Sequence, residues 1–145
     1  MAPKIFLLVD DDHDDTEMFC EALREIDASI LCYYAFNGSE ALRKLHNNEI
    51  PQPDIIFMDI NMPEMNGWRC LEKLKNDATY KHIPVIMYST SSNPKDITIA
   101  AELGAAFFYT KANEYKKMKT FLETVVLHIE KGSVDPMFMP PSSYC

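Results

Sequence analysis

Residues 5–12, IFLLVDDD, join five consecutive apolar residues to three aspartates. A continuous apolar run of this length is typical of a strand that is buried on both faces, as in a parallel sheet. Carboxylates that are adjacent in the sequence repel one another, and each raises the cost of ionising its neighbours. The stretch therefore predicts a buried strand whose carboxyl end carries an acidic binding site.

Four further apolar runs follow, and helical patterns alternate with them. We expect strands at residues 4–10, 30–36, 54–59, 83–89 and 105–111. We expect helices at residues 14–26, from Ser39 onward with Ser39 as the cap, at 66–77, between Asn93 and Gly104, and at 113–131. Such alternation predicts an α/β fold with a parallel sheet and helices on both faces. We expect a flavodoxin-like (βα)5 fold with the strand order 2-1-3-4-5.

Polar side chains stand at the carboxyl ends of four of the five predicted strands. Asp10 and Asp11 follow the first strand, Asp59 ends the third, Ser89 ends the fourth and Lys111 ends the fifth. Ligands of open α/β sheets bind at this edge, near the switch in strand order. Carboxylates are hard oxygen ligands suited to Mg²⁺, a lysine is a compact cation for a phosphoryl oxygen, and a carboxylate can act as a nucleophile.

Four motifs carry a family resemblance: LLVDDD (7–12), FMDINMPEMNGW (57–68), IPVIMYST (83–90) and FFYTK (107–111). In this order, at these strand ends, they make the chain similar to the receiver domain of bacterial two-component response regulators. The resemblance runs from residue 4 to about residue 131 and is to the single-domain, chemotaxis-type members. We expect a receiver domain at residues 1–131 and a disordered tail at residues 132–145.

The resemblance implies a role for each acidic residue at the strand ends. Asp59 corresponds to the phosphoacceptor. Asp11 corresponds to the direct Mg²⁺ ligand and Asp10 to an acid that acts mainly through water. Asp59 and the main-chain carbonyl of Asn61 would complete the metal ligands that the protein supplies.

Further roles follow from the same resemblance. Ser89 corresponds to the hydroxyl and Lys111 to the lysine that contact the phosphoryl group, and Phe108 stands at the position of the switch aromatic. Met62 and Ser91 are assigned to the positions that tune autodephosphorylation. Neither is an acid or an amide that would orient water, which favours a slow reaction.

The chain departs from the family pattern at two positions. Ala112 follows Lys111 where the family commonly has a proline in a cis bond. A cis bond before alanine would cost about 3 kcal/mol, so a trans bond here could place Lys111 differently. Phe108 replaces a tyrosine and lacks the hydroxyl that a partner could contact.

The implied function is that of a phosphorylated switch rather than an enzyme with its own substrate. The phosphodonor would be a sensor histidine kinase or a phosphotransfer protein, and a second, unidentified protein would be the target. The net charge of −8 argues against nucleic-acid and membrane binding. Four cysteines without metal-like spacing, and no signal or transmembrane segment, indicate a cytoplasmic protein.

Three alternatives compete with this interpretation. The acids from Asp10 to Glu21 partly match an EF-hand loop, but Asp15 replaces the required glycine and a strand precedes the loop. The Asp10-x-Asp12 pattern resembles the nucleophile motif of haloacid-dehalogenase-type phosphatases, but Asp14 stands where threonine is needed. A receiver fold used as a non-phosphorylated interaction module is the third alternative, and Ala112 is its best support.

Overall fold

The computed structural model describes residues 3–90, 93–111 and 114–130. Its elements are β1 (Ile5–Val9), α1 (His13–Ile26), β2 (Leu31–Ala35), α2 (Gly38–His46), β3 (Ile55–Met58), α3 (Gly67–Lys75), β4 (Val85–Ser89), α4 (Pro94–Glu102), β5 (Phe107–Thr110) and α5 (Tyr115–Glu130). The strands form one parallel sheet in the order β2-β1-β3-β4-β5, which confirms the predicted fold and topology. Ser91, Ala112 and the predicted tail at residues 132–145 lie outside the described residues.

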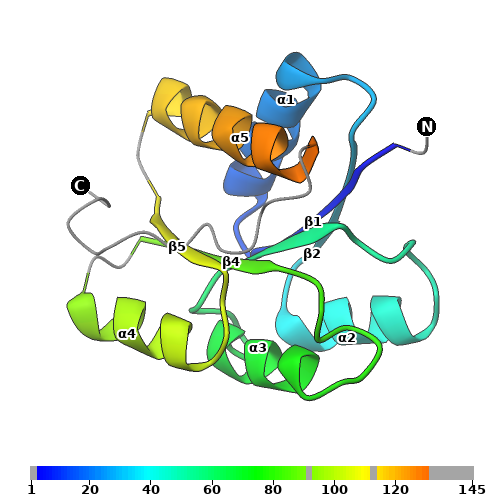
Figure 1. The fold of residues 1–145 in the computed structure, drawn as a ribbon, viewed down its shortest axis with the longest axis vertical. Coiled ribbons are helices and arrows are strands. Elements are labelled where there is room, and N and C mark those ends of the chain that lie inside the picture. Colours follow the sequence, from blue (N-terminus) through cyan, green and yellow to red (C-terminus); the bar gives the residue numbers. More distant parts are fainter. Residues whose placement is uncertain (1–2, 91–92, 112–113, 131–145) are drawn as a thin grey trace.

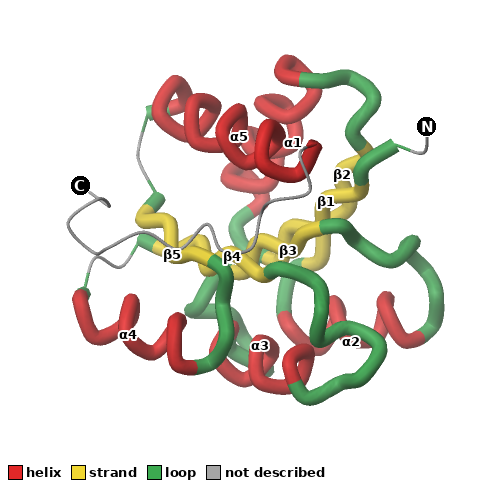
Figure 2. Tube along the Cα trace, in the orientation of Figure 1, coloured by secondary structure: helices red, strands yellow, loops and turns green. Residues whose placement is uncertain are grey.

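The sheet lies between two layers of helices. Helices α1 and α5 cover one face, and α2, α3 and α4 cover the other (Figures 1 and 2). Successive side chains of a strand point to opposite faces. Phe6 and Leu8 of β1 accordingly pack under α1 and α5, whereas Leu7 and Val9 belong to the second core on the opposite face. Both faces of β1 are therefore apolar, as its sequence predicts.

Asparagine and aspartate side chains cap the N-termini of four helices, α1, α2, α3 and α4. Asp12, Asn37, Asn66 and Asn93 each accept a hydrogen bond from a main-chain N–H in the first turn of α1, α2, α3 and α4 respectively. The prediction of Ser39 as the cap of the second helix was wrong. Asn37 takes that position because its side chain accepts from the N–H of Glu40 at 2.8 Å.

Main-chain hydrogen bonds continue beyond the strands and bring their polar ends to one edge of the sheet. The N–H of Asp10 donates to Ala35, that of Asp59 to Val9, and that of Lys111 to Ser89 at 2.7 Å. The residues that follow β1, β3 and β5 are therefore placed by the sheet itself. No helix in the described part of the chain is both long and apolar enough to span a membrane.

Candidate functional site

Three carboxylates meet at the carboxyl ends of β1 and β3. Asp10, Asp11 and Asp59 each offer an oxygen, and these oxygens lie within 4.8 Å of one another. Asp10 is fully buried and Asp59 is 8% exposed, whereas Asp11 is exposed. The cluster thus opens to solvent on the side of Asp11.

Lys111 is the cation of this cluster. Its Nζ lies 2.8 Å from Oδ2 of Asp10 and 3.7 Å from Oδ2 of Asp59. The same Nζ lies 4.9 Å from the centre of the Tyr88 ring, within range of a cation–π interaction. The lysine side chain is only 9% exposed. It therefore crosses from β5 to β1 and compensates charge that the interior would otherwise leave unpaired.

Asp15 is a fourth carboxylate of the site, which the sequence analysis missed. Its Oδ2 lies 2.9 Å from Nζ of Lys111. Asp12 and Asp14 are exposed in the first turn of α1, as expected of residues at a helix start, but Asp15 is half-buried. Because Asp15 is three residues after the N-cap Asp12, one turn of helix returns it to the strand end. That spacing is the signal that could have identified it.

Burial and charge shift the pKa values of the cluster. Burial raises the pKa of Asp59 to about 6, and the nearby Asp10 and Asp11 also raise it, against the lowering effect of Lys111 and of the Ile60 N–H. Burial likewise raises the pKa of Asp10, although Lys111 and the Asp12 N–H oppose the shift. For Lys111 burial lowers the pKa, but its hydrogen bonds to Asp10 and Asp15 prevail and raise it to about 12. The lysine therefore stays charged at neutral pH.

The other predicted site residues differ in their surroundings. Ser89 is the last residue of β4 and is fully buried, whereas the neighbouring Thr90 is exposed. Phe108 is fully buried in the core on the side of α2, α3 and α4. Asn61 is exposed, two residues beyond Asp59.

Met62 does not lie at the surface of the site. Its side chain is 8% exposed and belongs to the same apolar core as Phe108. Met62 therefore offers no polar group to water at the carboxylates, and its assignment to the control of autodephosphorylation stays a prediction. Asn61, one residue earlier, is exposed and carries an amide.

Residues 6–123 match the family model described as the response regulator receiver domain. The chain belongs to this family. The matched residues include β1 from Phe6 onward and the whole of β2, β3, β4 and β5. It replaces the EF-hand and phosphatase interpretations of the acidic run, in which Asp12 caps α1.

Receiver-domain proteins resemble the chain over most of its length. Response regulator Rcp1 of Synechocystis sp. is 28% identical over 137 residues, which cover 86% of this chain and 93% of Rcp1. The crystal structure of the phosphorylated cyanobacterial phytochrome response regulator RcpA superposes with a TM-score of 0.84 at 27% identity, over 91% of this chain and 97% of that one. The crystal structure of the Mn²⁺-bound form of Rcp1 superposes with a TM-score of 0.77 at 27% identity, over 85% of this chain and 91% of that one.

The donor set of this receiver domain fits a divalent cation. The oxygens of Asp10, Asp11 and Asp59 are hard ligands, and their mutual distances suit a small ion that keeps several waters. Lys111 offsets only part of their charge. A divalent cation at this edge would neutralise the remainder.

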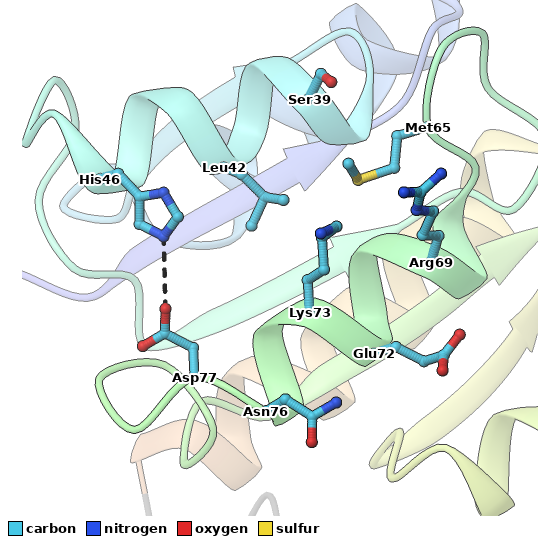
Figure 3. A pocket seen from close by; sticks show the side chains of 9 residues that line it. All are labelled: Ser39, Leu42, His46, Met65, Arg69, Glu72, Lys73, Asn76 and Asp77. Atoms are coloured by element: carbon cyan, nitrogen blue, oxygen red, sulfur yellow. Dashed lines mark ion pairs between the residues drawn. The ribbon is translucent and has the colours of Figure 1, made fainter.

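The surface of the receiver domain also carries two grooves away from the carboxylates. One, of about 740 Å³, lies between α2 and α3 and contains the ion pair between His46 and Asp77 at 3.5 Å (Figure 3). The other, of about 330 Å³, lies beside α1 and β2 and is lined in part by His13, Cys20 and Tyr34. Neither groove includes a residue predicted for phosphorylation.

Proposed function

We propose that the chain is a phosphorylated signalling switch that accepts a phosphoryl group on Asp59. The observation that carries the proposal is the cluster of Asp59, Asp10 and Asp11, in which Asp10 and Asp59 also lie within 4 Å of the largely buried Lys111. Phosphoryl transfer depends mainly on positioning and on neutralising charge, and these four side chains supply both.

Asp59 is the nucleophile in this proposal. Its Oδ1 accepts a hydrogen bond from the N–H of Ile60 at 2.8 Å, which fixes the orientation of the carboxylate. A carboxylate oxygen attacks phosphorus, a P–O bond forms, and the bond from phosphorus to the histidine nitrogen of the donor breaks. A histidine kinase or a phosphotransfer protein is the donor, and the product is an acyl phosphate.

Asp10, Asp11, Asp59 and the main-chain carbonyl of Asn61 hold Mg²⁺ in the proposed site. The ion neutralises the carboxylates and the oxygens of the incoming group when it is bound. Asp10 is fully buried and already accepts from the N–H of Asp12 at 2.9 Å, so it acts mainly through water, as the resemblance implies. Asp11 is exposed and serves as the direct ligand.

Lys111 and Ser89 contact the phosphoryl group after transfer. The new group adds a charge of about −1.5 to −2. Lys111 then exchanges its contact with Asp15 for one with the phosphoryl oxygens, since its Nζ is already 3.7 Å from Asp59. Ser89 donates its hydroxyl, and the ring of Phe108, which is buried next to β4, follows this movement.

The output is a change in the surface formed by α4, β5 and α5, which alters the affinity for a cytoplasmic target protein. Phosphorylation of Asp59 and the later loss of the phosphoryl group serve signalling, and the chain has no other substrate in this proposal. Residues 1–131 are the receiver domain in this proposal, and residues 132–145 are a tail outside it.

Incubation with acetyl phosphate and Mg²⁺, followed by electrophoresis on a phosphate-retarding gel, tests the proposal. We expect a retarded band for the native chain, and none when EDTA replaces Mg²⁺. Asp59→Asn should abolish the band. The exposed Asp14→Asn is the matched control and should keep it. A native chain that is never retarded would favour the non-phosphorylated interaction module, and a band that survives Asp59→Asn would place the phosphoryl group elsewhere.

A further inference from the structure

Cys20 and Cys32 face one another on the side of the sheet that α1 and α5 cover. Cys20 lies in the middle of α1 and Cys32 in the edge strand β2, and their Sγ atoms are 2.6 Å apart. The two cysteines are separated by 12 positions in the sequence. A disulfide has an S–S bond of about 2.0 Å, so only a small movement separates this pair from a covalent bond.

The pair is accessible to a small oxidant. Both side chains are half-exposed, and Cys20 lines the groove of about 330 Å³ beside α1 and β2. Glu17, Glu21 and Arg24 also line this groove, so its wall is polar and open to water. Cys70 is different: it is a fully buried residue of α3 on the opposite face of the sheet, and its thiol donates to the carbonyl of Gly38.

The two thiols are chemically unequal. The hydrogen bond from Cys32 lowers the pKa of Cys20, against the effect of burial, and Arg24 one turn further along α1 adds to this lowering. For Cys32 the hydrogen bond to Cys20, burial and the charge of Cys20 all raise the pKa. Cys20 is thus the more readily ionised of the two and the better suited to attack, and Cys32 lies in contact to resolve the product.

We propose that Cys20 and Cys32 are a redox site, in which a peroxide drives a reversible disulfide that joins α1 to the edge strand β2. The Cys20 thiolate attacks a peroxide oxygen, an S–O bond forms, and the O–O bond breaks with release of hydroxide. The Cys32 sulfur then attacks the sulfenic acid on Cys20. The S–S bond forms, the S–O bond breaks, and hydroxide leaves with the thiol proton as water. Two electrons pass from the thiols to the peroxide, and a dithiol reductant returns them.

The cross-link would restrain the helix that carries Asp15. Cys20 is five residues after Asp15 on α1, and Asp15 holds Lys111. The disulfide closes a short loop of chain, which constrains the unfolded state and stabilises the folded one. This redox chemistry needs no phosphorylation and stands independently of the function proposed above.

Peptide mapping of the peroxide-treated protein tests the proposal. Trypsin cuts after Arg24 and Arg43, so the two cysteines fall in separate peptides, residues 5–24 and 25–43. We expect the oxidised sample to contain these two peptides joined and lighter by two hydrogen atoms, and dithiothreitol to separate them. We also expect the Tm of the oxidised chain to rise by about 5–10 °C.

Two variants and one control complete the test. In Cys32→Ser, Cys20 can still be oxidised to the sulfenic acid but has no second thiol to react with. Dimedone should therefore label Cys20, and the Tm should not rise. In Cys20→Ser neither the linked peptides nor the label should form. Cys145→Ser should behave as the native chain. The proposal is overturned if the native chain stops at an oxidised Cys20 with Cys32 still free, or if the cross-link joins other cysteines or two molecules.

Discussion

Lys111 and Asp10 form a buried ion pair, and Asp15 and Asp59 also lie within 4 Å of the lysine Nζ. Asp10 is fully buried and the Lys111 side chain is 9% exposed. Removal of one partner from such a pair leaves an uncompensated charge in the interior, at a cost of about 3–5 kcal/mol. We expect Lys111→Met to lower the free energy of unfolding by about 3 kcal/mol in EDTA, as measured by urea denaturation.

Mg²⁺ should stabilise Lys111→Met more than it stabilises the native chain. Without the lysine, the carboxylates have no other partner of positive charge among the contacts described for them, so Mg²⁺ should raise the Tm of Lys111→Met by more than it raises that of the native chain. Asp15→Asn is the control. It loses a half-exposed contact, should cost about 1 kcal/mol or less, and keeps the pair with Asp10. An equal response to Mg²⁺ in all three proteins would contradict the role of Lys111 as the counter-ion.

Asp59 should make the stability of the metal-free chain depend on pH. Its folded-state pKa of about 6 lies above the ordinary value of 3.8, so the folded state binds the proton more tightly than the unfolded state. The stabilisation from protonated Asp59 is therefore complete below pH 3.8 and is lost as the pH rises through 6.

Asp59→Asn should remove the loss of folding stability that deprotonation of Asp59 causes. In EDTA at pH 7.5 we expect the variant to be more stable than the native chain by up to about 3 kcal/mol, the equivalent of the pKa shift. The advantage should shrink as the pH falls below 6 and vanish near pH 4, in thermal denaturation followed by circular dichroism. An advantage that did not change with pH would show that Asp59 titrates at its ordinary pKa.

At this scale the sequence predicts which residue types meet but not every contact. The alternation of strands and helices places Asp10, Asp59 and Lys111 at one edge of the sheet, because parallel strands end together. Asp15 was missed since its role depends on the direction in which α1 leaves β1. The burial of Met62 was not predicted, because its position in the motif does not reveal that its side chain turns into the core.

At the scale of elements, α3 begins against the end of β3. The N–H of Gly67 donates to the carbonyl of Ile60 at 2.8 Å, and a Cβ on Gly67 would lie 2.0 Å from the carbonyl oxygen of Asp59. No side chain fits there unless the backbone moves. The glycine therefore allows the helix to approach the strand end that carries Asp59.

Gly67→Ala should shift the backbone of Asp59 and so disturb the site. We expect a loss of about 1–3 kcal/mol in stability and slower labelling by acetyl phosphate. Gly104→Ala is the matched comparison. Gly104 has φ of +92°, so alanine would be strained there, but its Cβ would be 3.6 Å from the nearest atom, in the side chain of Lys75. The Gly104→Ala variant should lose stability but keep the native labelling rate. Equal labelling rates in the Gly67→Ala and Gly104→Ala variants would contradict the proposed effect of Gly67.

The ends of elements were harder to predict than their existence. The first strand was expected at residues 4–10 and observed at Ile5–Val9, and the other strands are shortened in the same way. The assigned ends of strands commonly differ by one or two residues, and main-chain hydrogen bonds continue past them at Asp10 and Asp59. The cap of α2 was assigned to Ser39, although Asn37 two residues earlier accepts from the first turn.

At the scale of the whole molecule, the order of the strands in the sheet differs from their order in the chain. β1 pairs with both β2 and β3, so these three strands are complete by Met58. β4 and β5 add to the other side of β3 only afterwards, and Lys111 follows β5. The sequence predicts this order from the (βα)5 pattern and the positions of the polar strand ends.

A protein synthesised from its N-terminus therefore brings Asp10 and Asp59 together before their lysine exists. During that interval the acids have no counter-ion of their own. A cation from solution can take that place, and the folding intermediate benefits more than the finished fold. We expect Mg²⁺ to increase the refolding rate of Lys111→Met, which lacks the lysine as the unfinished chain does, after dilution from urea, and to do so less when Asp59→Asn is added. A metal bound at that stage would take part in folding before it took any part in signalling.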